Sequence, residues 1–388
     1  MVATGFGDLS VGVGSMSALV YQAQPVSLDK NMAIDWKALT QTAAGSPFTA
    51  WPWVSTWLNT LVDAAWVVRV YQGSLLVAMT VLIQRRHRHR GGFPARSLHL
   101  NHSGDDALDQ IWPEYNGFVV RSGHEAEVYQ TCLSGLKKAL PNWDEFCTGV
   151  MRDERVVAIN QQANFLVHTL WEAPTYSVDL TRLRLQGQNY LDSLSRSTRY
   201  QIRQSRRKLE GLGHLTFTTD TESEAVLNGF KRIGPFHEQD WGKQSGYLNP
   251  HFTRFHHALI LSPEAKGLTR IHTAWLNEKP IASLYNLRFC KRDYFYLGFA
   301  DRTLDKAIRP GLMLHAWQIQ QALDEGHLEY DFMGGDMQYK RQLAECTGQL
   351  VSVRLKQPCL KFEVEQTLRQ TLQRVLAIRE AWRERASA

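Results

Sequence analysis

One short segment, His237-Glu238-Gln239-Asp240-Trp241, places three titratable side chains beside a tryptophan. A neutral imidazole is well suited to accept a proton at neutral pH, and a carboxylate can replace it when burial raises its pKa. We therefore take His237 as the candidate general base. The carboxylates that could replace it are Glu238, Asp240 and Asp336. A single histidine is more often structural than catalytic, so a structural role is the alternative interpretation.

A second candidate site is the loop that ends in Arg309-Pro310-Gly311-Leu312. Aromatic alternation predicts a strand over Tyr294–Ala300 before this loop, and apolar spacing predicts a helix after it, from Leu312 to Gly326. A strand over Leu328–Phe332 would complete a βαβ unit with two parallel strands. The free N–H groups at such a helix N-terminus favour an anion, pyrophosphate included. The alternative is that Pro-Gly only begins the helix.

A third candidate is the basic segment from Arg196 to Lys208, which holds six arginine or lysine residues. Helical spacing places Arg199, Arg203 and Arg206 along one side of the predicted helix. A row of guanidinium groups can hold phosphates through paired hydrogen bonds. A solvated helix face is the alternative interpretation.

Composition and cysteine usage limit the class of protein. The chain has 388 residues, enough for two domains, with the 44% hydrophobic and 21% charged content of a globular protein. Its five cysteines include no Cys-x-x-Cys pair, so the sequence favours neither a disulfide framework nor a cysteine zinc site. This cysteine usage predicts a reducing, cytoplasmic location. A net charge of +6 fits an anionic ligand such as coenzyme A, a nucleotide-linked sugar, an acyl carrier protein or tRNA.

The sequence predicts no secretory signal and no membrane span. The first twenty residues lack lysine and arginine and are expected to form a loose tail. The most apolar window, from Ala64 to Ile83, is interrupted by Arg69, Gln72 and Gly73. This polar centre predicts two strands around a turn.

The chain is expected to divide into two domains, 21–165 and 166–358, between a tail (1–20) and a C-terminal helix (359–388). The pattern is weak between residues 161 and 176, which predicts a connecting segment at the boundary. In the N-terminal domain, the patterns predict a short helix after Ser46, a helix over 125–140, and strands over 66–71, 75–84, 143–150 and 155–159.

A dense charge run, from Arg85 to Arg90, contains four arginines and two histidines. It could bind phosphates, and the histidines could take a metal. Because charge runs at strand ends are usually solvated, we assign no metal ligands in this sequence.

These segments occur in a recognisable order. Residues 195–213, Phe236 to Trp241 and Pro280 to Tyr285 lead into the Pro-Gly loop and the ending Gly-Asp…Tyr339-Lys340. Together they resemble the acyltransferase domain of the GNAT superfamily in CelD-type proteins of cellulose biosynthesis, which is related to the Fem-type transferases of peptidoglycan bridges. The similarity extends to the N-terminal half and implies an α/β (α+β) fold of two GNAT-like domains.

The resemblance implies where an acyl donor would bind. Acyl transfer needs a bound donor, a polarised carbonyl, a deprotonated amine and a protonated thiolate. The strand that contains Tyr296 and the residues Arg309, Pro310, Gly311 and Leu312 would supply backbone N–H groups to acyl-CoA or acetyl-CoA. The usual acetyl-CoA loop, with two small residues, is absent because Gly311 is the single glycine between 302 and 312.

The resemblance also suggests roles for side chains. Tyr339 would protonate the thiolate, Lys340 would stabilise negative charge, and Asp336 would assist catalysis. The expected substrate contacts are Arg199, Arg203, Asp240, Trp241, Tyr296 and Asp331. For Asp331, orienting Lys340 or a backbone amide is favoured over direct chemistry, and a strand-end carboxylate without a role is the alternative.

Three functions remain open at this stage. The first is an acyl-CoA-dependent transferase that acts on a sugar, a polysaccharide precursor or a small amine, with no tightly bound cofactor. The second is a Fem-type transferase that uses aminoacyl-tRNA; an acyl carrier protein is a further possible donor. The third is a non-catalytic scaffold of a biosynthetic complex. The sequence suggests no binding to DNA and leaves a homodimer open.

Overall fold

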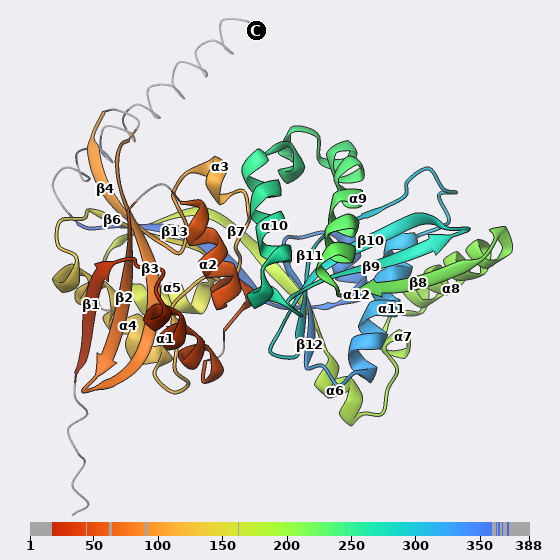
Figure 1. The fold of residues 1–388 in the computed structure, drawn as a ribbon, viewed down its shortest axis with the longest axis horizontal. Helices are drawn as coiled ribbons and strands as arrows, with labels where there is room; N and C mark the ends of the chain where they lie inside the picture. The colour runs from red at the N-terminus through yellow and green to blue at the C-terminus, as the bar shows by residue number, and fades with distance from the viewer. Residues whose placement is uncertain are drawn as a thin grey trace, which may run out of the picture.

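The computed structural model describes residues 18–358 except 44, 62, 63, 90, 91 and 162, together with Phe362, Val364, Thr367 and Thr371. Within these residues, thirteen strands form one mixed sheet that runs along the longest axis of the molecule (Figure 1). The strands are β1 (Leu19–Pro25), β2 (Ala65–Gln72), β3 (Leu75–Arg88), β4 (Pro94–Leu100), β5 (Val119–Val120), β6 (Glu145–Arg152), β7 (Leu166–Asp179), β8 (Leu215–Asp220), β9 (Thr269–Leu276), β10 (Lys279–Phe289), β11 (Arg292–Ala300), β12 (Glu329–Gly334) and β13 (Glu345–Lys356).

Helices pack against this sheet in both halves of the molecule (Figure 1). Those of the described residues are α1 (Lys30–Gln41), α2 (Trp51–Thr60), α3 (Asp106–Asp109), α4 (Glu125–Ala139), α5 (Asp153–Asn160), α6 (Leu180–Leu185), α7 (Tyr190–Ser193), α8 (Arg196–Leu212), α9 (Ser223–Trp241), α10 (Pro250–Leu261), α11 (Pro310–Asp324) and α12 (Gln338–Leu343). Within the described ranges, no helix combines the length and apolar character that crossing a bilayer needs.

The predicted βαβ unit is present as β11, α11 and β12. The two strands pair in parallel, with Tyr294 opposite Asp331, and α11 connects them. The turn at Asn277 and Glu278 joins β9 to β10 in the predicted hairpin, and both residues have positive φ values. Each of these pairings is local in sequence, so that the pattern alone could predict it.

The strand order, β1-β2-β3-β4-β6-β13-β7-β12-β11-β10-β9-β8, shows how the two halves are connected. The last strand in sequence, β13, pairs with β6 on one side and β7 on the other. A strand near the C-terminus therefore completes the sheet of the N-terminal half. The predicted division at residues 165 and 166 falls at the start of β7 and stays a prediction.

Two predicted elements are wrong. The expected connecting segment, 161–176, contains most of β7, whose first seven residues are exposed and so lack alternating burial. The expected strand at 155–159 is part of α5, where Asp153 and Glu154 occupy the first turn and Val156 and Ile159 are buried three residues apart. In this segment, packing of a helical face against α4 overrides the β propensity of two adjacent valines.

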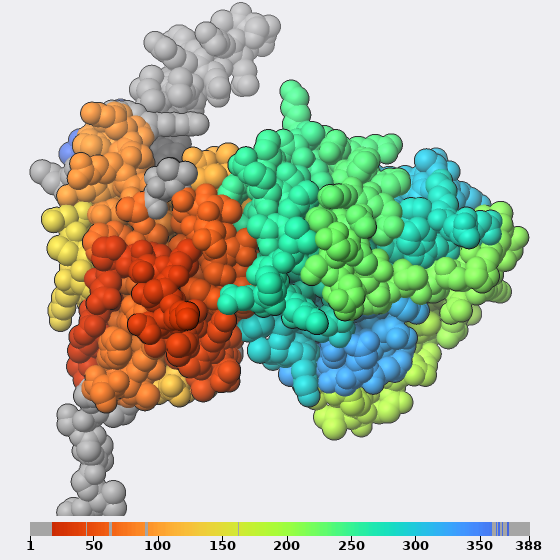
Figure 2. Space-filling model, viewed as in Figure 1, coloured from red at the N-terminus to blue at the C-terminus, as the bar shows by residue number. Residues whose placement is uncertain are grey.

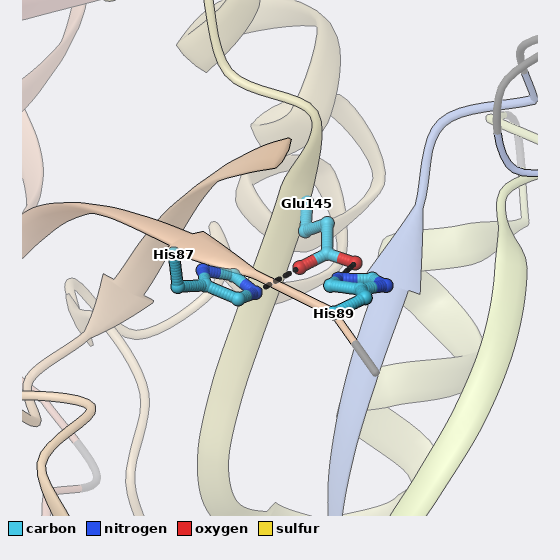
Figure 3. A group of neighbouring side chains, drawn as sticks. All are labelled: His87, His89 and Glu145. Atoms are coloured by element: carbon cyan, nitrogen blue, oxygen red, sulfur yellow. Dashed lines mark ion pairs between the residues drawn. The ribbon is translucent and has the colours of Figure 1, made fainter. Parts of the chain in front are cut away.

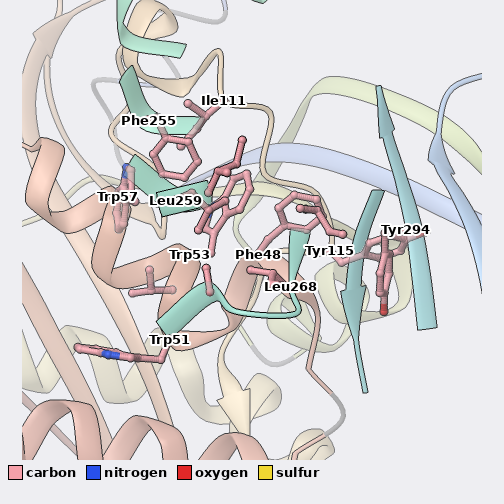
Figure 4. Packing of buried hydrophobic residues seen from close by; sticks show 14 of the residues in the cluster. Phe48, Trp51, Trp53, Trp57, Ile111, Tyr115, Phe255, Leu259, Leu268 and Tyr294 are labelled. Atoms are coloured by element: carbon pink, nitrogen blue, oxygen red, sulfur yellow. The ribbon is translucent and has the colours of Figure 1, made fainter. Parts of the chain in front are cut away.

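One hydrophobic cluster spans both halves of the molecule. It includes Trp53, Phe255 and Tyr294, and the rings of Trp53 and Phe255 meet at 4.7 Å between centroids (Figure 4). In the space-filling view, the orange N-terminal surface lies directly against the green surface of the C-terminal half (Figure 2). The shared core fixes the position of one half relative to the other.

The two predicted terminal segments lie largely outside the described residues. Residues 1–17 of the expected tail are not described, and β1 begins at Leu19. The expected C-terminal helix is described only at the four positions given above, all of which are helical.

Candidate active site

A cavity of about 1510 Å³ opens between the two halves. Its walls come from the end of α9, the strands β11 and β12, the start of α11, and the segment from Asp106 to Glu114. From the sequence, we expect the catalytic residues in the C-terminal half. The structure adds residues of the N-terminal half to the same wall.

The strands β11 and β12 diverge at the cavity. They pair in parallel only from Arg292 to Tyr294 and from Glu329 to Asp331. Beyond these residues, Phe295–Ala300 and Phe332–Gly334 line opposite parts of the cavity. Backbone groups on the facing edges therefore have no strand partner there and are available to a ligand that lies between the strands.

The N-terminus of α11 opens into the same cavity, which Arg309, Pro310, Gly311 and Leu312 all line. Proline at the first helical position fits because that position needs no donor. The N–H of Arg309 donates to the hydroxyl of Ser205 on α8, at 2.9 Å, which anchors the loop. The four predicted residues are thus brought together at a site that favours an anion.

Salt bridges hold the loop that precedes α11. Lys208 and Asp305 are 2.8 Å apart and join the loop to α8. Arg302 and Asp240 are 3.1 Å apart and join it to α9. Asp240 and the half-exposed Trp241, both predicted substrate contacts, line the cavity. The carboxylate of Asp240 is already paired with the guanidinium of Arg302.

His237 lies in the last part of α9, is buried, and lines the cavity. Its Nδ1 atom is 2.8 Å from the hydroxyl of Ser245. Its ring lies between Trp112 and Trp241, with centroid distances of 6.3 and 5.9 Å. Burial lowers the pKa of His237 to about 4, so the imidazole is neutral at pH 7 and is a weak base.

Lys340 and Glu114 meet the end of β12 from opposite halves of the molecule. The ammonium group of Lys340 donates to the carbonyl of Gly334 at 2.5 Å, and Glu114 accepts the N–H of the same glycine at 2.7 Å. Both side chains line the cavity. Burial lowers the pKa of Lys340 and raises that of Glu114. Attack on a carbonyl carbon requires a cation, which stabilises the negative oxygen, and a base, which a carboxylate with a raised pKa can supply.

Asp331 stabilises the backbone at the end of β12. It is buried and absent from the cavity lining, and its Oδ1 accepts the N–H of Met333 at 2.6 Å and the hydroxyl of Tyr115 at 2.9 Å. Met333 has a φ of 61°, at a register shift between β12 and β7. Asp331 thus holds the irregular backbone that directs Gly334 toward Lys340. Burial raises the pKa of Asp331 to about 7.

Tyr339 lies against the wall formed by α11. Its ring stacks on His315 with a centroid distance of 5.7 Å, and both residues line the cavity. Burial raises the pKa of Tyr339, so its hydroxyl keeps its proton at neutral pH. A hydroxyl of this kind can act as a proton donor.

Four predicted site residues either lie outside the cavity lining or have their polar group bound to another residue. Arg199 and Arg203 do not line the cavity; they line a separate hollow of about 820 Å³ on α8. Asp336 also lies outside the lining and binds Tyr176 and Arg341. Tyr296 lines the cavity, but its hydroxyl donates to the carbonyl of Ile111 at 2.5 Å.

Sequence reasoning missed Trp112, Glu114 and His315. The first two follow no motif, and they enter the cavity only because the shared core joins the two halves. His315 occupies a buried position of α11, where a histidine among apolar residues was a usable signal. Its Nδ1 lies 3.0 Å from the hydroxyl of Tyr330.

The buried histidines predict acid sensitivity. Burial lowers the pKa of His237 to about 4 and that of His315 to about 3, from 6.5. Between pH 6.5 and about 4 the unfolded chain therefore binds more protons than the folded protein, so the free energy of unfolding falls as pH falls. In urea titrations, His237→Gln is expected to reduce this slope by up to about 1.4 kcal/mol per pH unit. An unchanged slope would contradict a neutral, buried His237.

Part of the chain is similar in sequence to a known domain family. Residues 196–341 match the family model described as an acetyltransferase (GNAT) domain. That region holds the divergent strands, the start of α11, His237 and Lys340, and it is similar in sequence to a GNAT-type acetyltransferase domain. None of the curated proteins is significantly similar in sequence to this chain.

Solved structures with a similar fold cover nearly the whole chain. FemX is 11% identical with a TM-score of 0.55, over 84% of this chain and 96% of that one. A conserved protein of unknown function from Bacteroides thetaiotaomicron is 10% identical with a TM-score of 0.53, over 86% and 99%. The C-terminal domain of a protein assigned as a lysylphosphatidylglycerol synthetase, from Agrobacterium fabrum, is 11% identical with a TM-score of 0.50, over 83% and 91%. These likenesses show a shared α/β fold.

Proposed function

We propose that the protein transfers an acyl group from acyl-CoA to an amine or hydroxyl group, on a sugar, a polysaccharide precursor or a small amine. The observation that carries this proposal is the divergence of β11 and β12 directly in front of the N-terminus of α11. A thioester donor would place its extended arm between the strands and its phosphates at Arg309–Leu312. No tightly bound cofactor is needed for this chemistry.

The proposed mechanism uses groups from both halves. The acceptor nitrogen or oxygen attacks the thioester carbonyl carbon while Glu114 takes its proton. Lys340 and the free N–H groups at the diverging strands stabilise the negative oxygen of the tetrahedral intermediate. The carbon–sulfur bond then breaks, and Tyr339 protonates the departing thiolate.

This mechanism moves the role of the base from His237 to Glu114. A histidine with a pKa of about 4 holds a proton weakly, whereas burial makes the Glu114 carboxylate a stronger base than an ordinary glutamate. His237 then orients the acceptor beside Trp112 and Trp241. Asp336, which lies outside the lining, has no role in the proposed steps.

The donor site is tested by thermal unfolding with CoA and with acyl-CoAs of increasing chain length. Ligand at about 100 times its Kd stabilises by roughly 2.7 kcal/mol, which raises the unfolding temperature. Gly311→Glu is expected to abolish this increase because it adds negative charge at the phosphate site. The same charge favours the start of α11 by about 0.3–1 kcal/mol, so the unliganded variant stays folded.

Gly311→Gln is the matched control, since it adds the same bulk without the charge and should retain more of the temperature increase. No increase with any acyl-CoA in the unmodified protein would contradict the proposed donor. Charged tRNA would then be tested as donor, as the Fem-type alternative requires. Absence of transfer from either donor would favour the scaffold function.

A further inference from the structure

A buried cluster in the N-terminal half lies outside the proposed reaction. It consists of His87 on β3, His89 directly after that strand, and Glu145 on β6 (Figure 3). None of the three lines the cavity. We propose that this cluster binds a divalent transition-metal ion, with Zn²⁺ as the best fit to two imidazoles and one carboxylate.

The sheet brings the three side chains to one place. His87 and His89 are two residues apart at the end of β3, so they project from the same face. In the strand register, Arg85 lies opposite Ser97 of β4, and Ser97 lies opposite Glu145 of β6. The two histidines therefore reach over β4 to a carboxylate two strands away.

The donor atoms have the spacing of a ligand set. The Nε2 atom of His87 is 3.3 Å from one oxygen of Glu145, and the Nε2 atom of His89 is 2.8 Å from the other. Ligands that surround a tetrahedral Zn²⁺ ion at about 2.0–2.2 Å lie roughly 3.3 Å from one another. Figure 3 shows the two rings on either side of the carboxylate. Three protein ligands would leave one position for water.

The carboxylate of Glu145 has ion-pair neighbours but no aligned hydrogen bond among the described residues. Glu145 is fully buried, and no described group donates an aligned hydrogen bond to either of its oxygens. Arg354 and Lys356 of β13 approach these oxygens only to 3.7 and 3.8 Å. A buried carboxylate without hydrogen bonds is costly, and a bound cation would satisfy both oxygens.

The contacts of His87 are compatible with the tautomer whose Nε2 atom is free to bind a metal ion. Its Nδ1 atom is 3.3 Å from the hydroxyl of Ser97, which is also 2.8 Å from Nε2 of His99. If Ser97 accepts from His87 and donates to His99, the lone pair of His87 faces Glu145. A second polar residue that orients a ligand histidine in this way is usual at metal sites.

Lys356 opposes metal binding. Its ammonium group lies 3.3 Å from Nδ1 of His89 and can only donate a hydrogen bond, so Nδ1 accepts in this arrangement. A metal ion on Nε2 would leave the ring proton on Nδ1, which would turn the ammonium group away. Lys356→Met should therefore bind metal at least about tenfold more tightly, because a like charge has been removed.

The test is a titration of chelator-treated protein with Zn²⁺ by calorimetry and with Co²⁺ by visible absorption. One ion per chain is expected, with at least about tenfold weaker binding in His87→Gln and Glu145→Gln. His214→Gln, which alters an exposed histidine of the other half, is the control and should bind as the unmodified protein does.

Glu145 is fully buried, whereas the side chain of His87 is partly exposed, so His87→Gln decides the ligand assignment. Circular dichroism would verify the fold of this variant. Failure of both the unmodified protein and Lys356→Met to bind either ion would overturn the proposal. Equal affinity in His87→Gln would also overturn it. Acyl transfer is measured separately, since none of the three ligands takes part in it.

Discussion

Replacement of Lys340 by methionine is expected to lower kcat/KM for acyl transfer by about 10²–10³-fold. The ammonium group is buried at the cavity wall and donates to the carbonyl of Gly334, where the two strands have separated. Because Lys340 is largely shielded from water, its fixed cation stabilises a developing negative oxygen more than a solvated ammonium group would. The measurement is steady-state transfer from the acyl-CoA that gives the largest thermal stabilisation.

Lys306→Met is the matched control, because Lys306 also lines the cavity but is exposed at its rim. It should change kcat by less than about twofold, since exposed charges interact weakly. Lys340→Met also leaves the Gly334 carbonyl without its donor, which costs about 1–3 kcal/mol, so both variants are compared well below their unfolding temperatures. A folded Lys340→Met protein with normal kcat/KM would remove Lys340 from the mechanism.

The arrangement of the Pro-Gly loop at the cavity could be predicted because this part is built from neighbouring segments. The strand before the loop, the Pro-Gly start and the helix after it lie within about 35 residues, and each has its own periodic or capping signal. The structure places Arg309, Pro310, Gly311 and Leu312 at the cavity as one unit. Local patterns were sufficient for this part.

The contribution of the N-terminal half could not be predicted in this way. Glu114 reaches Gly334 across 220 positions of the chain, and β13 pairs with β6 across about 200. Such pairings depend on how two sheets merge and on a core that both halves share. A single sequence carries no periodic signal for them.

Several candidates chosen by residue type lie outside the cavity lining or have other partners in the structure. Arg199 and Arg203 have the chemistry to bind phosphates, yet they face a hollow on α8 that is separate from the cavity. Asp336 follows β12, but its carboxylate is held by Tyr176 and Arg341. For Asp331 the favoured interpretation agrees with the contacts, because it accepts a backbone amide. Partners already present in the fold decide which polar groups remain available.

Replacement of Glu114 by glutamine is expected to lower kcat/KM by about 10²–10⁴-fold, the usual contribution of a general base. The amide keeps the acceptor oxygen for the Gly334 N–H but cannot take a proton from the acceptor. Burial raises the pKa of Glu114, so in the unmodified enzyme kcat/KM should rise with pH through a value above the ordinary 4.5. Glu114→Gln should lose that rise.

The control for Glu114 is Asp106→Asn, which neutralises an exposed carboxylate of the same cavity wall and should leave the pH profile unchanged. Glu114 and Lys340 both bind Gly334, so their effects should not add. The double variant Glu114→Gln, Lys340→Met is therefore expected to lose much less than the product of the two single losses. Strict additivity, or a pH profile that follows His237→Gln instead, would return the role of the base to His237 and make Glu114 a residue that only positions the strand end.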